Sequence, residues 1–179
     1  MSNQMPDNTD IIYRVNSSDQ ICFANRPYDE FARANDGEPA LSSAVLNRSL
    51  WSFIADPVTE QLYREVLRRV RSGRTIKFTL RCDSPDCRRL MEMEVVAAAD
   101  QNVTFRTRLL SQESRPPQAM LERHTRTSDH LLRMCSWCCR VNWDGNWIEL
   151  EVAARQSGLF EAASPPASRM GSAIHVSRR

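Results

Sequence analysis

The sequence is poor in the residues from which catalytic and cofactor sites are most often built. Among its 179 residues it has five glycines, three histidines and a single lysine, Lys77. It contains no glycine-rich phosphate loop, no G-x-S-x-G and no H-E-x-x-H pattern. These absences favour a protein that binds rather than catalyses, so we expect it not to be an enzyme.

Long apolar runs are also missing. No stretch approaches the about 20 apolar residues that a membrane-spanning helix needs. The first segment, "MSNQMPDNTD", lacks the basic-then-apolar order of a secretion signal, and 26% of all residues are charged. We therefore expect a cytoplasmic protein that does not contact a membrane.

An excess of charge of one sign is absent as well, because the formal net charge is only +2. Strong sequence-independent attraction to nucleic acid needs a pronounced positive field, so nucleic acid is not expected as a partner. Basic residues nevertheless gather between Arg64 and Arg89. We interpret them as the solvated face of a helix, with a set of phosphate contacts as the alternative.

Of the patterns that are present, the clearest predicts a helix from Asp56 to Gly73. Asp56 is a good N-cap, Pro57 suits the first helical position, and Gly73 is a typical stop. Apolar residues recur along one face of this helix, namely Val58, Leu62, Tyr63, Val66, Leu67 and Val70. A shorter helix is predicted after Asn25, with Pro27 in its first turn.

Alternation of apolar and polar residues predicts five strands. Two short strands, Ile11–Val15 and Ile21–Phe23, come first, and three more lie in "TIKFTLRC", "LMEMEV" and "VTFRTRL". Short connections make the last three an antiparallel meander, with Glu92 and Glu94 expected opposite arginines of the next strand. Because a bare meander cannot cover its apolar face, the first pair must join it. The expected class is α+β, a five-stranded antiparallel sheet with helices on one face.

Residues 11–110 resemble a PAS domain. The matching segments are "IIYRVNSSDQICFAN", "RPYDEFARA", "VLNRSLWSFI", "DPVTEQLYREVLRRV" and the three final strands. The match covers just over half of the chain and depends on the order of elements, because PAS motifs are loose. The resemblance implies a sensor or interaction domain of a bacterial pathway. Such a domain pairs as a homodimer and binds a small-molecule ligand or a signalling protein such as a kinase or regulator.

The resemblance also implies which cofactors to consider. Flavin photochemistry in this fold uses a cysteine near "LNRSLWSFI", which has none. Haem usually takes a histidine on or near the long helix, whereas the first histidine is His124. Flavin and haem are therefore not expected. The residues expected to line any cavity, which a plain core needs equally, are Phe23, Phe31, Trp51, Phe53, Leu62, Phe78, Met91, Met93 and Phe105.

The stretch "MCSWCCRVNWDGNW" carries a C-x-x-C pair, Cys135 and Cys138, followed by the turn pair Asp144-Gly145. It resembles a zinc-ribbon-like tail that follows sensor domains in some bacterial signalling proteins. That tail continues with a helix and a second cysteine pair, which is missing here, and His175 is the soft ligand in its place. Structural zinc takes four ligands. Two interpretations remain open: zinc held by Cys135, Cys138, His175 and an improvised fourth ligand, or a decayed site held by tryptophan packing.

Two further cysteines, Cys82 and Cys87, flank the turn "DSPD" between two predicted strands. They would face each other if they lie directly across the strand pair. A reversible disulfide is then conceivable, whereas a cytoplasmic location favours reduced thiols. We expect reduced thiols.

The expected organisation is a flexible segment at 1–10, a PAS-like sensor domain at 11–110, a linker at 111–128 and a small C-x-x-C hairpin-helix segment at 129–179. We expect a non-enzymatic signalling protein that acts by binding. Two alternatives stay open. One is a zinc-dependent nucleic-acid-binding regulator that uses the arginine-rich helix, and the other is a thiol-redox switch that uses one of the two cysteine pairs.

Overall fold

The computed structural model describes residues 9–118, 131–135, 137–157 and 167–171, and the chain divides into two compact units. Unit 1 comprises Met1–Ala55, Glu60–Phe78 and Glu92–Leu109. Unit 2 comprises Asp56–Thr59, Thr79–Met91 and Leu110–Arg179. No helix in the described ranges is both long and apolar enough to cross a membrane.

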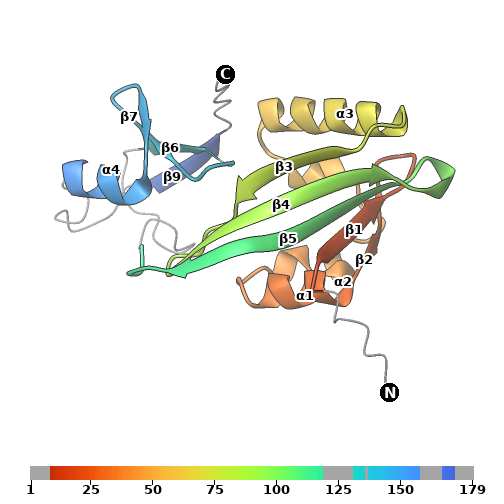
Figure 1. Ribbon diagram of the computed structural model, residues 1–179, viewed down its shortest axis with the longest axis horizontal. Helices are drawn as coiled ribbons and strands as arrows, with labels where there is room; N and C mark the ends of the chain where they lie inside the picture. The colour runs from red at the N-terminus through yellow and green to blue at the C-terminus, as the bar shows by residue number, and fades with distance from the viewer. Residues whose placement is uncertain (1–8, 119–130, 136, 158–166, 172–179) are drawn as a thin grey trace. The chain divides into compact units, whose positions relative to one another are not determined.

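Five strands form an antiparallel sheet in the order β2-β1-β5-β4-β3 (Figure 1). Their bounds are β1 Ile11–Val15, β2 Ile21–Ala24, β3 Ile76–Arg81, β4 Cys87–Ala97 and β5 Val103–Ser114. β1 lies between β2 and β5, with Tyr13 opposite both Ala24 and Phe105. The first hairpin thus joins the last three strands, and the predicted α+β class with a five-stranded antiparallel sheet is confirmed.

Two helices begin where their capping residues predict. α1 (Arg26–Arg33) is capped by Asn25, whose side chain accepts a backbone N–H of the first turn at 3.0 Å. α3 (Pro57–Arg71) follows Asp56, whose carboxylate accepts a backbone N–H at 2.7 Å. Between these helices lie three short elements, η1 (Glu38–Ala40), α2 (Ser42–Val45) and η2 (Leu50–Phe53).

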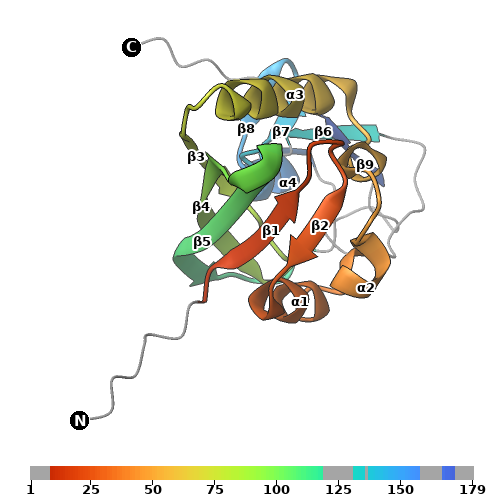
Figure 2. The same ribbon diagram turned by 90° about the vertical axis from the view of Figure 1, so that its right-hand side faces the viewer.

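The helices of unit 1 pack on one face of the sheet. Tyr13 of β1 and Phe105 of β5 stack with ring centroids 4.6 Å apart. Tyr28 of α1 meets Tyr13 edge-on at 6.2 Å, and Tyr63 of α3 stacks on Phe105 at 6.1 Å. Both helices therefore cover the face that carries Tyr13 and Phe105, as predicted, and α1 lies close to β1 and β2 in Figure 2. Burial raises the pKa of the Tyr13 hydroxyl well above its usual value.

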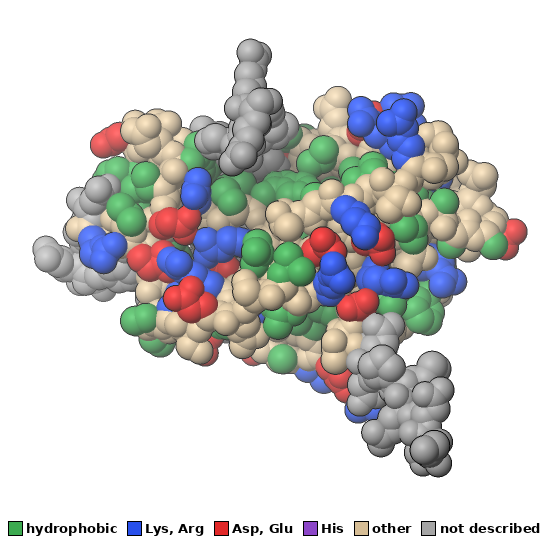
Figure 3. Space-filling model, in the orientation of Figure 1, with side chains coloured by type: hydrophobic (Ala, Val, Ile, Leu, Met, Phe, Trp, Pro, Cys, Tyr) green, Lys and Arg blue, Asp and Glu red, His purple; other side chains and the backbone are tan. Residues whose placement is uncertain are grey.

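The opposite face of the sheet is charged. Arg108 pairs with Glu92 at 2.7 Å, and Lys77 pairs with Glu94 at 2.8 Å. Arg106 lies 3.8 Å from Glu94. Figure 3 shows basic and acidic side chains beside one another over the middle of the molecule. The predicted cross-strand ion pairs are confirmed. Solvent screens them, so they stabilise the sheet only weakly.

Unit 2 contains a second sheet in the order β8-β7-β6-β9. Its elements are β6 Leu131–Cys135, β7 Val141–Trp143, β8 Asn146–Ile148, α4 Leu150–Ser157 and β9 Ala167–Gly171. The turn between β7 and β8 is Asp144-Gly145, with φ angles of 47° and 82°. Positive φ at both turn residues is what a two-residue hairpin of this kind requires. β6 and β9, which the sequence did not predict, pair in parallel with Cys135 opposite Gly171.

A partly buried charged cluster also belongs to unit 2. The side chains of Asp83 and Arg115 are only 1% and 5% exposed, and they pair at 3.3 Å. Arg115 binds Glu151 of α4 at 2.8 Å, and Arg81 binds both Asp83 and Glu149. Burial opposes ionisation of Glu151, but hydrogen bonds from Arg88, its own backbone N–H and Arg115 outweigh it and lower its pKa to about 2. The cluster joins the turn between β3 and β4 to the start of α4.

The last strand of the main sheet, β5, extends beyond the end that the sequence predicts. β5 continues to Ser114, and the N–H of Arg115 then donates to Asp86 O at 2.9 Å. The first residues of the predicted linker at 111–128 therefore belong to a strand and to the charged cluster. The alternation that would have revealed this is missing, because every β5 residue after Thr107 is exposed.

Candidate functional site

Most of the residues predicted to line a cavity are buried or half-buried. Phe105 is fully buried, and Met91 and Met93 are buried. Phe105 is stacked between Tyr13 and Tyr63, so aromatic rings occupy the space between α3 and the sheet. The half-buried members of the predicted set are Phe31, Trp51, Leu62 and Phe78. The buried members fit the interpretation as a plain core.

Phe23 and Phe53 were wrongly placed in the interior, because they are 40% and 39% exposed. Phe23 lies across the strand pair from Arg14, whose guanidinium carbon is 5.3 Å from the ring centroid. Arg48 covers Phe53 in the same way at 4.7 Å. Each arginine shields one ring face, which makes an exposed aromatic ring tolerable. A strand as short as β2, with four residues, carries too little alternation to assign its faces.

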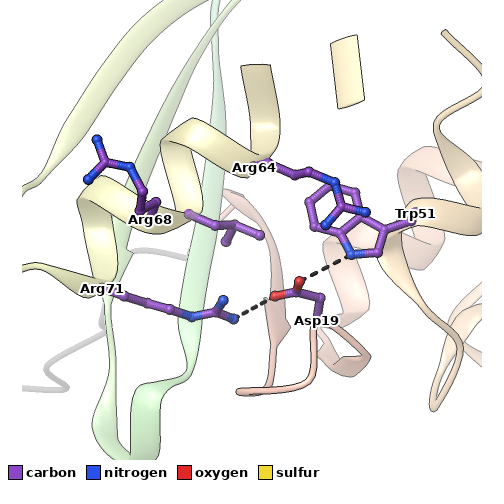
Figure 4. Close-up of a pocket in the computed structure, with 6 residues that line it drawn as sticks. Asp19, Trp51, Arg64, Arg68 and Arg71 are labelled. Carbon is purple, nitrogen blue, oxygen red and sulfur yellow. Dashed lines mark hydrogen bonds and ion pairs between the residues drawn. The ribbon is translucent and has the colours of Figure 1, made fainter. Parts of the chain in front are cut away.

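A hollow of about 290 Å³ lies on the outside of unit 1 beside α3 (Figure 4). We call it the α3 hollow, and its lining consists of Asp19, Trp51, Arg64, Leu67, Arg68 and Arg71. Asp19 belongs to the turn between β1 and β2, where its φ of 59° suits aspartate better than most residues. Its carboxylate accepts hydrogen bonds from Trp51 Nε1 at 3.1 Å and from Arg71 Nη2 at 2.7 Å. The turn, η2 and α3 are tied together at this point.

The arginines of the α3 hollow differ in exposure. Arg71 is 22% exposed and also donates to Asn16 O at 2.9 Å, so it is a structural member of the hollow. Arg64 and Arg68 are 52% and 69% exposed. The guanidinium carbon of Arg64 lies 4.0 Å from the centroid of the Trp51 ring (Figure 4). One wall is therefore an arginine–tryptophan stack, and Arg68 presents an accessible guanidinium beside it.

Carboxylates on α3 compensate part of this positive charge. Glu60 binds Arg64 at 2.6 Å, and Glu65 binds Arg68 at 2.7 Å and Arg69 at 2.6 Å. Hydrogen bonds from Arg68 and Arg69 lower the pKa of Glu65 to about 2, so this carboxylate is ionised at neutral pH. A guanidinium has five N–H donors. The arginines consequently keep donors for an acceptor outside the chain.

A second, polar hollow of about 260 Å³ continues along α3 and is lined by Arg68, Arg69, Ser72 and Arg74. Arg68 lines both hollows. Guanidinium groups are suited to bind carboxylates and phosphates through paired hydrogen bonds. Within the ranges that the structure describes, no three His, Cys, Asp or Glu side chains converge on a point that could hold a metal ion. The chemistry that this surface offers is anion binding.

The C-x-x-C pair lies in a tight turn after β6. Cys135 is fully buried, Cys138 is half-buried, and their thiols hydrogen-bond to each other. The N–H of Trp137 donates to Cys135 Sγ at 3.4 Å, and the N–H of Arg140 donates to Cys138 Sγ. Burial raises the pKa of the Cys138 thiol. We call Cys135, Trp137, Cys138, Cys139 and Arg140 the cysteine turn.

The second predicted cysteine pair is not brought together as a disulfide. Cys82 and Cys87 are free thiols. Backbone bonds set Cys82 opposite Arg89 and Cys87 opposite Ser84. Cys82 and Cys87 therefore do not lie directly across the strand pair, which was the condition for a disulfide between them. His175 lies outside the described residues.

Sequence reasoning noted the arginines of α3 and Trp51 but did not connect them. It assigned the arginines to a solvated helix face and Trp51 to the core, and it passed over Asp19. The available signal was the aspartate in the turn "NSSDQ". In the structure its side chain is only 19% exposed, and a carboxylate that is this far buried needs a cationic or N–H partner. Its partners lie 32 and 52 residues away in the sequence, which no local pattern reveals.

No protein-family model matches this chain. No curated protein matches it either. A similar solved structure is the PAS domain of an HTR-like protein from Haloarcula marismortui, which is 20% identical, with the match covering 58% of this chain and 84% of that chain at a TM-score of 0.32. The assignment of fold class therefore rests on the strand order and the helix positions described above.

Proposed function

We propose that this chain is a non-enzymatic signalling component that acts by binding, and that the α3 hollow docks a carboxylate-rich segment of a partner protein. The observation that carries this proposal is the combination of Trp51 with Arg64 and Arg68 around one exterior hollow. Tryptophan and arginine are among the residues most enriched at the positions that dominate interface energetics. Leu67 at the base of the hollow adds an apolar contact.

The geometry of the hollow supports a rigid docking site. Arg71 and Trp51 are both bound to Asp19, so the base does not need to be ordered when a partner arrives. Arg64 is held on the Trp51 ring and paired with Glu60. Preorganisation of this kind lowers the entropic cost of association. An incoming carboxylate would meet Arg68, the most exposed guanidinium of the hollow.

Binding of an interior cofactor is less well supported. The stack of Tyr13, Phe105 and Tyr63 fills the region between the helices and the sheet. A small-molecule ligand in that region would have to displace these rings. The exterior hollow needs no such rearrangement, and we therefore favour protein binding over ligand sensing.

An acidic protein segment is favoured over nucleic acid for reasons of charge. Nucleic-acid binding depends on many phosphate contacts along an extended positive surface. Here Glu60, Glu65 and Asp19 offset part of the arginine charge, and the formal net charge of the chain is only +2. A hollow of about 290 Å³ accommodates one or two side chains rather than a stretch of backbone.

The class of partner and the oligomeric state that we propose follow from the PAS resemblance of residues 11–110. The partner is a signalling protein such as a kinase or regulator of a bacterial pathway, and the chain itself pairs as a homodimer. Native mass spectrometry at micromolar concentration tests the second point. A species that is monomeric throughout the concentration series would contradict it.

The docking site is tested with a fluorescein-labelled peptide of alternating glutamate and leucine, titrated with the purified chain and followed by anisotropy. The paired variant Arg64→Ala/Arg68→Ala should weaken binding by about tenfold or more, since hydrogen bonds to charged groups contribute about 1.5 to 3 kcal/mol each. Arg26→Ala/Arg33→Ala on α1 is the matched control, because it removes the same charge from another exposed helix.

Three results would argue against the α3 hollow as the docking site. Equal weakening by both double variants would mean that only net charge matters. If the unmodified chain does not measurably bind the peptide, a carboxylate-rich segment is excluded as the partner. Tighter binding of a single-stranded DNA oligonucleotide of the same charge, lost in Arg64→Ala/Arg68→Ala, would assign the surface to nucleic acid instead.

A further inference from the structure

The cysteine turn brings two thiols together in a geometry that its surroundings fix. Cys135 N–H donates to Arg140 O at 2.8 Å, and Cys139 N–H donates to Cys135 O at 2.9 Å, which closes the turn. Trp137 O accepts the N–H of Arg81 at 2.7 Å, which anchors the turn to the end of β3. These backbone bonds close the turn that carries Cys135 and Cys138, whose thiols hydrogen-bond to each other.

Two backbone N–H groups point at the two sulfur atoms. Trp137 donates to Cys135 Sγ, and Arg140 donates to Cys138 Sγ, so each thiol receives a bond from the residue two positions later. Hydrogen bonds to a sulfur atom stabilise its negatively charged form. Cys139 lies between the two donor residues, Trp137 and Arg140, in the chain. Its backbone is left-handed, with a φ of 54°, and a non-glycine residue adopts this conformation at a cost in free energy. With this conformation, the turn places one N–H group within hydrogen-bonding reach of each sulfur atom.

We propose that Cys135 and Cys138 bind a single thiophilic metal ion of low coordination number, with copper(I) as the chemical class. Both donors are sulfur, and thiolates are the ligands that select soft ions. Two facing thiolates satisfy a copper(I) ion, which accepts two-coordinate geometry. This site is separate from the α3 hollow and does not depend on the proposed docking function.

A tetrahedral zinc ion fits the described residues less well. Zinc requires four ligands in structural sites, and the described residues provide no third His, Cys, Asp or Glu that converges with this pair. The neighbouring thiol of Cys139 is engaged elsewhere, because it donates to Arg81 O at 3.8 Å. Apart from Cys139, the buried members of the adjoining cluster are Met134, Val141, Leu150 and Ala153, and none of these is a ligand that structural zinc takes.

The binding step balances in charge and protons. Each thiol loses its proton to solvent, and the two thiolates and one copper(I) ion form a complex with a single negative charge. The N–H groups of Trp137 and Arg140 lie where they stabilise that charge. Cys138, which is half-buried, gives the ion access from solvent, whereas Cys135 is fully enclosed.

The experiment is an anaerobic titration of the full chain, with its thiols reduced, against copper(I) held by a chromophoric chelator. Stoichiometric transfer of copper to the protein is expected. Cys138→Ser should abolish the transfer, because one thiolate then remains. Cys82→Ser is the matched control, since it removes a half-buried thiol of the same unit outside the turn, and it should leave the transfer unchanged.

X-ray absorption of the copper-loaded, unmodified chain gives a readout that does not depend on whether variants fold. Two sulfur neighbours and no nitrogen or oxygen neighbour are expected. Absence of transfer from the chelator, retention of copper in Cys138→Ser, or equal loss in Cys82→Ser would overturn the proposal. Stoichiometric zinc that is lost in His175→Ala would overturn it too, because it would show a four-coordinate site.

Discussion

Removal of the Arg115 guanidinium should destabilise unit 2 strongly, although this residue falls in a stretch that the sequence pattern assigns to a linker. Arg115 Nη1 lies 3.3 Å from Asp83 and 2.8 Å from Glu151, and Nη2 donates to Ser84 O at 2.9 Å. Loss of one partner of a buried ion pair costs about 3 to 5 kcal/mol. Asp83 keeps Arg81 as a second partner. The expected cost of Arg115→Ala is therefore near the lower end, about 3 kcal/mol.

The assay is urea unfolding followed by tryptophan fluorescence. Trp137, Trp143 and Trp147 all belong to unit 2. Introducing Trp51→Phe into every protein compared removes the fluorescence of unit 1. A loss of about 3 kcal/mol should lower the midpoint by about 1 to 3 M, because small proteins lose about 1 to 3 kcal/mol per molar urea.

Two further variants sharpen this test. Arg140→Ala removes an arginine of unit 2 that is 44% exposed and has Glu149 as its partner at 3.0 Å, so it should cost about 1 kcal/mol or less. Arg115→Lys keeps the charge but cannot form the planar fork of hydrogen bonds, and it should fall between the other two. A midpoint for Arg115→Ala no lower than that of Arg140→Ala would refute the reasoning that a buried charge network stabilises unit 2.

Other consequences can be measured on the same protein. Phe105→Ala should cost about 3 to 5 kcal/mol in chemical unfolding, since it empties a buried stack, whereas Arg106→Ala on the charged face should cost about 1 kcal/mol or less; similar losses at both sites would mean that the strand faces are misassigned. Glu151 has its pKa lowered to about 2, so its stabilising effect is complete above pH 4.5 and is lost as the pH falls towards 2. Glu151→Gln should therefore flatten the fall of melting temperature across that acidic range, and an unchanged acid profile would contradict the role of this carboxylate. Gly145→Ala should lower the melting temperature, because φ at this turn is +82°, and the loss should be about 1 kcal/mol; no change would mean that the hairpin turn adopts another form.

Short-range features of the fold could be predicted because their causes are local. A cap such as Asn25 or Asp56 acts on N–H groups within three residues of itself. Alternation in the last two strands reports the face directly, as the buried Val103 and Phe105 and the exposed Arg106 show. The helix stripe, the strand alternation and the short connections together determined the α+β class.

The alternation of apolar and polar residues did not predict the buried face where a strand is short, as in β2, or extends beyond the packed part of the sheet, as in β5. Phe23 is apolar but lies on the charged face of β2, and the pattern of four residues does not reveal this. The cation above its ring comes from Arg14 on the neighbouring strand. In such cases the neighbour, and not the residue itself, decides whether exposure is tolerated.

The sequence by itself determined the caps, the long helix, the strands of the main sheet and the turn at Asp144-Gly145. Only the tertiary structure decided that Asp19 joins Trp51 and Arg71 in one hollow, and that Arg115 is buried among carboxylates. The physical reason is the range of the forces involved. Capping and amphipathic periodicity depend on residues within one or two turns, whereas an ion pair or a ring stack depends on where the fold brings together side chains that are 30 or more positions apart, as the 52 residues between Asp19 and Arg71 illustrate.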